Sequence, residues 1–330
     1  MLPSRTDKKS VLICFLLCSL WVLPCCAIIS PARTDNDFKV VKARSGDSLS
    51  SLAARYLHDP SKGWIISEFN NIKTLTPGRE IIIPLKAFRP GGLNPDGYQT
   101  VPILAYQRFS EDPADKTTVS RQAFENQMKF LKENSYRTIT LGQLKDFFDF
   151  RGQIPEKAVV ITFDEGWRSV YDIAFPIVKK YGFSAVLFVS TDFIGQQKAL
   201  SWQQVKQLSK NGFDVQSLTK SHRNLVKMNQ HESFKAYFND LKKEITLSEE
   251  LIRQQLNKKC TYLAYPYGKT SNLVIALLKK HGYQGAFTLK RGSNPCFADK
   301  YRINRSAVLG NDDMERFKKS LLVFNKTKLK

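Results

Sequence analysis

The pattern of hydrophobic and polar positions divides the chain into two regions. Between residues 38 and 85, alternation at Phe38–Lys42, two short amphipathic stretches and an apolar run at Ile81–Pro84 predict the order strand, helix, helix, strand. From residue 99 onward, short apolar runs alternate with amphipathic helical stretches, which predicts a parallel sheet or barrel. The predicted fold class is therefore α/β, an incomplete TIM-like (β/α) barrel preceded by a small βααβ unit.

Six apolar runs in the second region are predicted as strands. They are Val101–Ala105, Ala158–Phe163, Ala185–Val189, Phe213–Gln216, Tyr262–Tyr265 and Gly285–Leu289. The helices predicted between them are one that begins at Ser120 and carries Phe124, Met128 and Leu131 on one face, then Ile173–Tyr181, Val205–Lys210, residues 232–256 and Leu273–Lys280. Residues just after the strands are the candidates for chemistry, because barrel enzymes carry their sites at the carboxyl ends of strands.

The N-terminal segment has the order of a secretory signal peptide. A basic start that ends at Lys9 is followed by the apolar run Val11–Leu23 and then by small residues. The run is shorter than the roughly 20 residues that span a bilayer, and an uncleaved anchor is the alternative. Cys25 or Cys26 could carry a lipid, or the segment could simply be cleaved. The sequence thus predicts a leader over residues 1–26 and export to the periplasm or cell envelope.

Polar and Pro/Gly-rich stretches set the predicted boundaries within the 330-residue chain. Residues 27–37 are polar and are predicted to be a linker. Residues 86–98 hold the densest cluster of prolines and glycines and predict a second linker between the small unit, 38–85, and a large domain over 99–310. A basic tail or helix over residues 311–330 completes the chain.

The formal net charge of +21 bears on the partners. An exported protein meets little nucleic acid, so an anionic envelope surface is the predicted partner, and the alternative is that lysines only solvate helix faces. Outside the leader the cysteines are Cys260 and Cys296. In an exported protein they could form a disulfide or remain two buried thiols, and the sequence does not choose.

Three segments after predicted strands could do chemistry. Asp164 and Glu165 are adjacent carboxylates at a strand end, where a metal, a division of labour or simple solvation would account for them. His222 follows the fourth strand, although a lone histidine is more often structural than a ligand. The aromatic turn at residues 264–268 follows the fifth strand and is suited to lining a groove.

The small unit resembles a LysM module. Val40–Lys42 followed by Gly46–Ala53 is similar to the opening of that module, and Leu75–Pro84 is similar to its close. The resemblance implies binding of N-acetylglucosamine-containing glycans such as peptidoglycan, in a groove between the two loops. The residues that it places there are Asp47, Ser48, Leu49, Leu75, Thr76 and Pro77.

The second region resembles the polysaccharide deacetylases of NodB-homology type, carbohydrate esterase family 4. Residues 101–106, 162–166, 217–225 and 264–268 carry the resemblance, which spans residues 99–310 and is strongest to deacetylases of poly-N-acetylglucosamine. It implies that a divalent metal, zinc in the first place, polarises the acetyl carbonyl and a water while an aspartate takes the water's proton.

The resemblance assigns roles residue by residue. Asp164 matches the general base, and Tyr267 matches the tyrosine whose backbone amide stabilises the oxyanion. Glu165 and His222 match two of the metal ligands. Arg305 is a candidate to reach the site, as an arginine does in some relatives.

Several positions depart from the family pattern. Leu218 stands where the first metal histidine belongs and has no lone pair, and Glu165 replaces an aspartate with a longer side chain. Gln107 replaces a histidine, and Ala264 replaces an arginine that orients the base in many relatives. The chain is therefore predicted to be an exported deacetylase-like protein with an incomplete metal triad, or alternatively a catalytically inactive glycan-binding protein. Its cofactor would be a divalent metal in the first case and none in the second.

A third, weaker hypothesis is a glycoside hydrolase that uses Asp164 and Glu165. Adjacent residues diverge on a strand, so these carboxylates lack the flanking geometry that glycoside hydrolysis needs.

Overall fold

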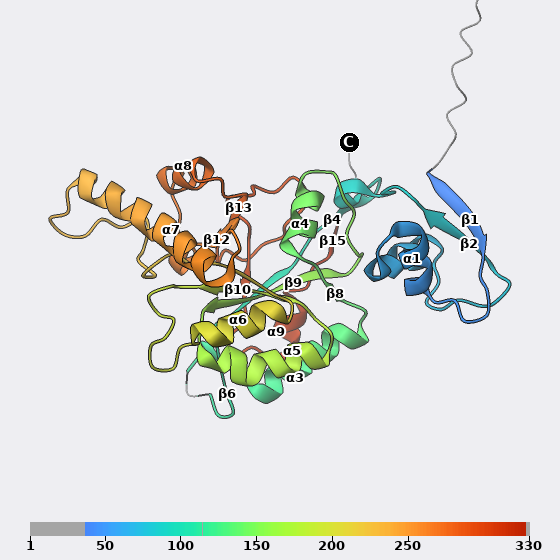
Figure 1. The fold of residues 1–330 in the computed structure, drawn as a ribbon, viewed down its shortest axis with the longest axis horizontal. Coiled ribbons are helices and arrows are strands. Elements are labelled where there is room, and N and C mark those ends of the chain that lie inside the picture. The colour runs from blue at the N-terminus through green and yellow to red at the C-terminus, as the bar shows by residue number, and fades with distance from the viewer. Residues whose placement is uncertain (1–36, 114, 328–330) are drawn as a thin grey trace, which may run out of the picture.

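The computed structural model describes residues 37–113 and 115–327, which form two units (Figure 1). The leader predicted over residues 1–26, with Cys25 and Cys26, lies outside the described residues, as does nearly all of the linker predicted over 27–37. Among the residues described, no helix has the length and apolar content needed to cross a membrane.

The small unit has the predicted βααβ order. Its elements are β1 (Phe38–Lys42), α1 (Leu49–Leu57), a 3₁₀ turn (Pro60–Lys62), α2 (Gly63–Phe69) and β2 (Glu80–Pro84). Strands β1 and β2 pair in antiparallel fashion, and the two helices pack on them. The core of this unit is aliphatic and consists of Ala43, Leu52, Ala53, Ile66, Ile72, Ile81 and Ile83.

Helix α1 begins at a capping box. The Ser48 hydroxyl accepts from the Ser51 backbone N–H, and the Ser51 hydroxyl accepts from the Ser48 N–H, at 3.0 and 2.9 Å. Ser48 is therefore the N-cap of α1.

The large unit is built on one sheet with the strand order β13-β12-β11-β10-β9-β5-β14, and β8 pairs beside β9. The strand pairs in this sheet are parallel, which confirms the predicted open α/β half-barrel. The strands are β5 (Ile103–Tyr106), β8 (Arg137–Thr138), β9 (Ala158–Glu165), β10 (Ala185–Val189), β11 (Phe213–Ser217), β12 (Tyr262–Ala264), β13 (Gly285–Phe287) and β14 (Ser306–Ala307).

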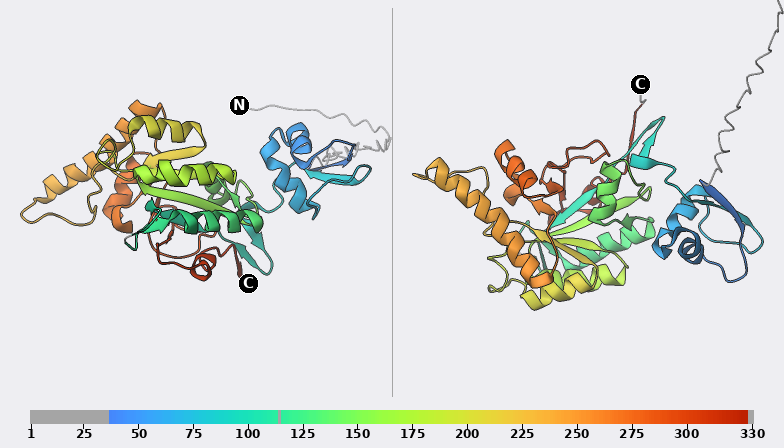
Figure 2. Two further views of the ribbon diagram at one scale, coloured as in Figure 1. Left: turned by 90° about the horizontal axis from the view of Figure 1, so that it is seen from below. Right: turned by 45° about the horizontal axis from the view of Figure 1, so that its top comes forward.

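Helices cover the outside of this sheet (Figures 1 and 2). They are α3 (Arg121–Glu133), α4 (Leu141–Phe148), α5 (Phe175–Lys180), α6 (Trp202–Lys210), α7 (Phe234–Leu256), α8 (Asn272–Lys280) and α9 (Met314–Lys318). A π-helical segment, Val170–Ala174, leads directly into α5. Helix α7 extends from the body on the side away from the small unit (Figure 1).

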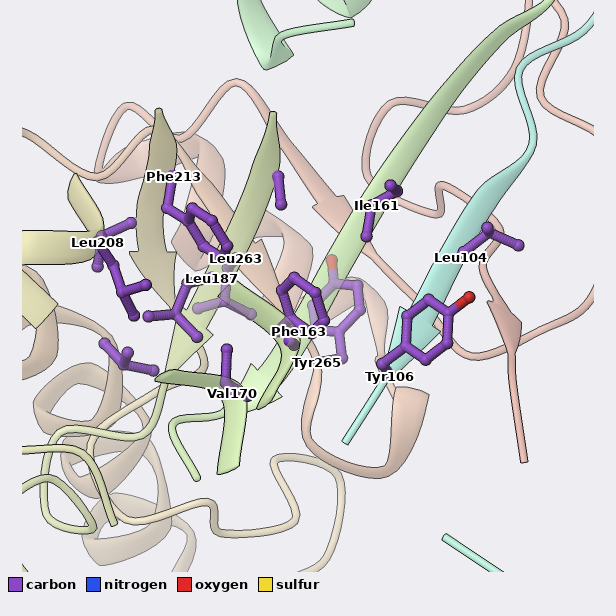
Figure 3. Packing of buried hydrophobic residues seen from close by; sticks show 14 of the residues in the cluster. Leu104, Tyr106, Ile161, Phe163, Val170, Leu187, Leu208, Phe213, Leu263 and Tyr265 are labelled. Carbon is purple, nitrogen blue, oxygen red and sulfur yellow. The ribbon is translucent and has the colours of Figure 1, made fainter. Parts of the chain in front are cut away.

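The strands of the half-barrel are buried on both faces, which explains their continuous apolar runs. On β9, Val159, Ile161 and Phe163 join the cluster under the outer helices, where Figure 3 shows Ile161 and Phe163. The alternate residues of β9, such as Val160, belong to a second cluster inside the barrel, which also contains Leu218. Because side chains alternate along a strand, Asp164 points to the same inner side as Val160.

Cys260 and Cys296 are buried free thiols, so the structure pairs neither of them. Burial raises the pKa of the Cys260 thiol well above its usual range.

The segment predicted as a linker over residues 86–98 is partly strand. Short strands β3 (Leu93–Asn94) and β4 (Gly97–Gln99) form a sheet with β15 (Phe324–Lys326), which lies in the segment predicted as a basic tail. One of the glycines that suggested a loop, Gly97, belongs to this pairing instead. A Cβ at Gly97 would collide with the Asn325 carbonyl oxygen, so the close approach of the two strands requires glycine there.

Ionic contacts join the small unit to the large one. Arg89 donates from Nη2 to Glu68 Oε2 of α2 at 3.1 Å and from Nη1 to Glu156 Oε1 at 2.8 Å. The Glu156 backbone N–H donates to the other Glu68 oxygen at 3.0 Å.

Two remaining strands, β6 (Arg108–Ser110) and β7 (Thr118–Ser120), form a separate parallel pair.

The junction is predicted to depend on pH. Burial raises the pKa of Glu68 to about 7, and the Glu156 charge adds to this while the Glu156 N–H and Arg89 oppose it. A carboxyl with a raised pKa contributes most to docking below its ordinary value and contributes less as pH rises through about 7. We measure the rate at which a protease cleaves the connecting segment, residues 85–89, in the unaltered chain and in a Glu68→Gln chain. We expect the ratio of the first rate to the second to be larger at about pH 8 than at about pH 6. A ratio of cleavage rates that does not change with pH would contradict this.

Candidate active site

A pocket of about 260 Å³ lies at the carboxyl ends of the strands. Parallel strands bring their carboxyl ends to one edge of the sheet, so the loops that follow β5, β9, β11 and β12 meet there. Among the residues that line the pocket are Gln107, Asp164, Glu165, Leu218, His222 and Tyr267. The structure thus brings together four segments that are far apart in the sequence.

Arg305 forms a buried ion pair with Asp164. Its Nη1 lies 2.7 Å from Asp164 Oδ1 and its Nη2 lies 2.9 Å from Oδ2, so the contact is bidentate. The side chain of Arg305 is fully buried. Nη1 also donates to the Thr162 hydroxyl at 3.1 Å, and Nε donates to the Thr288 carbonyl oxygen at 3.0 Å. Asp164 is therefore fixed in orientation and kept as an acceptor at the pocket wall.

Glu165 ends β9 in an unusual backbone conformation, with φ of 70°. Its Oε1 accepts a hydrogen bond from Gln107 Nε2 at 2.5 Å, and its Oε2 accepts one from the Trp167 indole N–H at 2.7 Å. Both carboxylate oxygens are therefore engaged by neutral N–H donors.

His222 and Tyr267 also line the pocket. Their rings are 4.8 Å apart in an edge-on arrangement, and His222 Nε2 lies 3.6 Å from Glu165 Oε1. Both residues have positive φ, 62° and 58°. Tyr267 is 58% exposed, which leaves its ring accessible for contact with a sugar.

The His222 loop is held by a buried carboxylate on α7. Glu244, which is 7% exposed, accepts from the Ser221 backbone N–H at 2.9 Å and from the Ser221 hydroxyl at 2.6 Å. The Glu244 carbonyl oxygen also accepts from the Lys220 N–H. Helix α7 thereby fixes the position of the residue before His222.

The side chains present do not fit the divalent metal that the family resemblance implies. Leu218 is buried, 1% exposed, and offers no lone pair at the position of a ligand. Glu165 and His222 remain, whereas catalytic zinc sites use three protein ligands. Across residues 37–113 and 115–327, no group of three His, Cys, Asp or Glu side chains is placed to hold a metal ion.

The predicted residues Asp164, Glu165, His222, Tyr267 and Arg305 gather around this pocket, while their roles stay predictions. Sequence reasoning noted Gln107 only as a substitution and did not identify Trp167. The signal for Trp167 was its place in the loop directly after Glu165, where a polar ring N–H can reach back to the strand end.

The two loops predicted to bind glycan in the small unit lie side by side. The Ala43 N–H donates to the Arg79 carbonyl oxygen, and the Gly78 N–H donates to the Ala43 carbonyl oxygen, both at 2.8 Å. Asp47 accepts from the Arg44 backbone N–H at 2.8 Å, which together with Arg55 lowers the pKa of its carboxyl. Asp47 therefore has a structural role in shaping its loop.

The other predicted glycan contacts of the small unit differ in exposure. Leu49 and Leu75 are partly buried, and Ser48, Thr76 and Pro77 are exposed at the loop edges.

Comparisons with known proteins agree with this architecture. The family model described as polysaccharide deacetylase matches residues 151–286. The poly-beta-1,6-N-acetyl-D-glucosamine N-deacetylase of Staphylococcus epidermidis is 33% identical over 206 residues, which cover 60% of this chain and 70% of that protein.

Solved structures show the same fold. IcaB from Ammonifex degensii superposes with a TM-score of 0.60 at 25% identity, covering 69% of this chain and 97% of that one. The Streptococcus pyogenes deacetylase PplD, in complex with acetate, gives a TM-score of 0.61 at 22% identity and covers 67% of this chain and 98% of that one.

The open parallel half-barrel is shared with these solved structures, so the chain is an α/β protein of the deacetylase fold. The chain belongs to the polysaccharide deacetylase family.

Breaking the buried ion pair is predicted to destabilise the fold. Arg305→Met leaves Asp164 buried without its partner, and we expect the free energy of unfolding to fall by about 3–5 kcal/mol. Urea denaturation followed by circular dichroism measures this. The double variant Asp164→Leu/Arg305→Met removes both charges and should recover most of the loss, and a double variant as unstable as the single one would contradict the argument.

Proposed function

We propose that this chain is an exported cell-envelope deacetylase-like protein that acts on N-acetylglucosamine-containing glycan in the pocket beside Asp164. The observation that carries the proposal is the buried Arg305 guanidinium, which holds both Asp164 oxygens at the wall of that pocket. A general base needs such a fixed, ionised carboxylate next to the reacting atoms.

The proposed reaction is hydrolysis of the N-acetyl amide of the glycan. A carboxylate has about four lone-pair positions, and Arg305 uses two on Asp164, so Asp164 retains capacity to accept a proton from water. The water oxygen would bond to the acetyl carbon as its proton passes to Asp164. The carbon–nitrogen bond would then break as the amine takes that proton, releasing acetate.

Tyr267 supplies the second group for this reaction. It lies in the turn Pro266–Gly268 with a non-helical φ of 58°, and it lines the pocket. A backbone N–H at the pocket rim is suited to stabilising the oxyanion that forms on the carbonyl oxygen.

A second candidate function is glycan binding without hydrolysis. Leu218 in place of a ligand, and a Glu165 whose two oxygens accept from Gln107 and Trp167, favour it. A polysaccharide deacetylase fold would then serve recognition alone.

Acetate release distinguishes the two functions. We expect the purified chain to release acetate from chitooligosaccharides or peptidoglycan, and Asp164→Asn to lower the rate at least about hundredfold because the base is lost. Asp172→Asn is the matched control, since Asp172 is exposed and follows the same strand. Circular dichroism checks that each variant is folded. No acetate release by the unaltered chain, together with glycan binding that Tyr267→Ala weakens in the pocket, would establish the second function instead.

We infer that the small unit is a LysM module that holds the protein on peptidoglycan. The side-by-side loops of residues 43–48 and 76–79 support this inference, together with the resemblance of their sequences to that module. The formal charge of +21 supports an anionic envelope surface as a further partner. We propose no nucleic-acid partner.

The exposed loop residue Thr76 tests the LysM proposal. Thr76→Asp places a charge in the proposed groove, and we expect about tenfold weaker co-sedimentation with peptidoglycan. Thr74→Asp is the matched control, because Thr74 is also exposed but lies outside the predicted contacts. Equal loss of binding in both variants would point to charge alone and contradict a groove at Thr76.

A further inference from the structure

Both carboxylate oxygens of Glu165 already accept hydrogen bonds within the protein. The Gln107 carboxamide and the Trp167 indole donate to its two oxygens, at 2.5 and 2.7 Å. Each donor presents a partial positive charge to the carboxylate. A cation that used Glu165 as a ligand would have to displace at least one of these N–H groups.

The pocket wall next to Glu165 is apolar and therefore also disfavours binding of a cation. Leu218 belongs to the apolar cluster inside the barrel, with Val186, Phe188 and Phe287 among its members. Leu289 and Leu309 add further apolar surface to the pocket. A divalent ion that entered would lose water ligands on this side without replacement, which is costly.

We infer that the Gln107 carboxamide stands in for the cation beside Glu165, so that the pocket binds an acetamido group without a metal. This inference rests on the proposed glycan function and names the recognised group. Gln107 is a specificity-determining residue in this arrangement, because it lines the pocket and is fixed by Glu165.

The chemistry of an N-acetylated amino sugar matches the pocket. The Gln107 amide nitrogen has two hydrogens, and Glu165 accepts one of them, so the second can bond the acetyl carbonyl oxygen. The acetyl methyl group matches the apolar surface of Leu218 and Leu289. The exposed Tyr267 ring offers a face for the sugar.

The test measures metal content and glycan binding separately. Chain purified after incubation with zinc and gel filtration should carry less than about a tenth of an equivalent by mass spectrometry of the metal. Its affinity for an N-acetylated chitooligosaccharide, measured by calorimetry in a Thr76→Asp background that weakens the proposed LysM groove, should agree within about twofold in zinc and in chelator. Gln107→Ala should weaken that binding about tenfold.

Two further variants provide matched controls. Gln107→Ala/Leu218→His releases Glu165 and supplies a third ligand, and should gain about one zinc per chain. Gln107→Ala/Leu218→Ile opens the same space without a nitrogen and should gain none. Circular dichroism confirms that both variants are folded.

Near-stoichiometric zinc in the unaltered chain, or glycan binding that the chelator abolishes, would overturn the inference. A chain that lacks zinc and binds no acetylated glycan would instead overturn the acetamido assignment together with the proposed function. The two failures are thus distinguished by the metal measurement.

Discussion

The ion pair between Asp164 and Arg305 is the interaction on which the organisation of the pocket depends. Asp164 lies at the end of β9 in the middle of the sheet, and Arg305 precedes β14 at one edge. The Nε of Arg305 reaches the Thr288 carbonyl oxygen just after β13, the strand at the other edge. One buried guanidinium therefore links both edges of an open barrel to its central strand. Such a pair is costly to bury, so its hydrogen bonds must all be made for the fold to tolerate it.

The strands could be predicted well because burial on both faces leaves a plain apolar signal. Strand β10, Ala185–Val189, has the bounds that its apolar run predicts. The β3-β4-β15 sheet could not be predicted, because it pairs residues near 97 with residues near 325 and its glycines read as a loop. The helix at Leu141–Phe148 was also not identified, although Thr140 and Gln143 form a capping box at its start.

The site was predictable to the extent that its residues follow strands. Asp164, Glu165 and His222 were identified in this way, and the structure places them at one pocket. Arg305 could be only a candidate, since 141 residues separate it from Asp164. The contacts of Gln107 and Trp167 with Glu165 depend on how two loops leave their strands. Side-chain hydrogen bonds of that kind follow from backbone torsions, such as the positive φ of Glu165, that residue order does not specify.

The short sheet formed by β3, β4 and β15 has a consequence for the proposed action of the two units on one polymer. It anchors the chain directly after the junction, so only residues 85–89 form a tether, with a fully extended reach of about 17 Å. A linker of that length keeps the small unit within the length of a few sugar residues from its attachment point. A polymer captured by one unit would therefore be presented to the other at high local concentration, and weak individual affinities would suffice for processive contact along it.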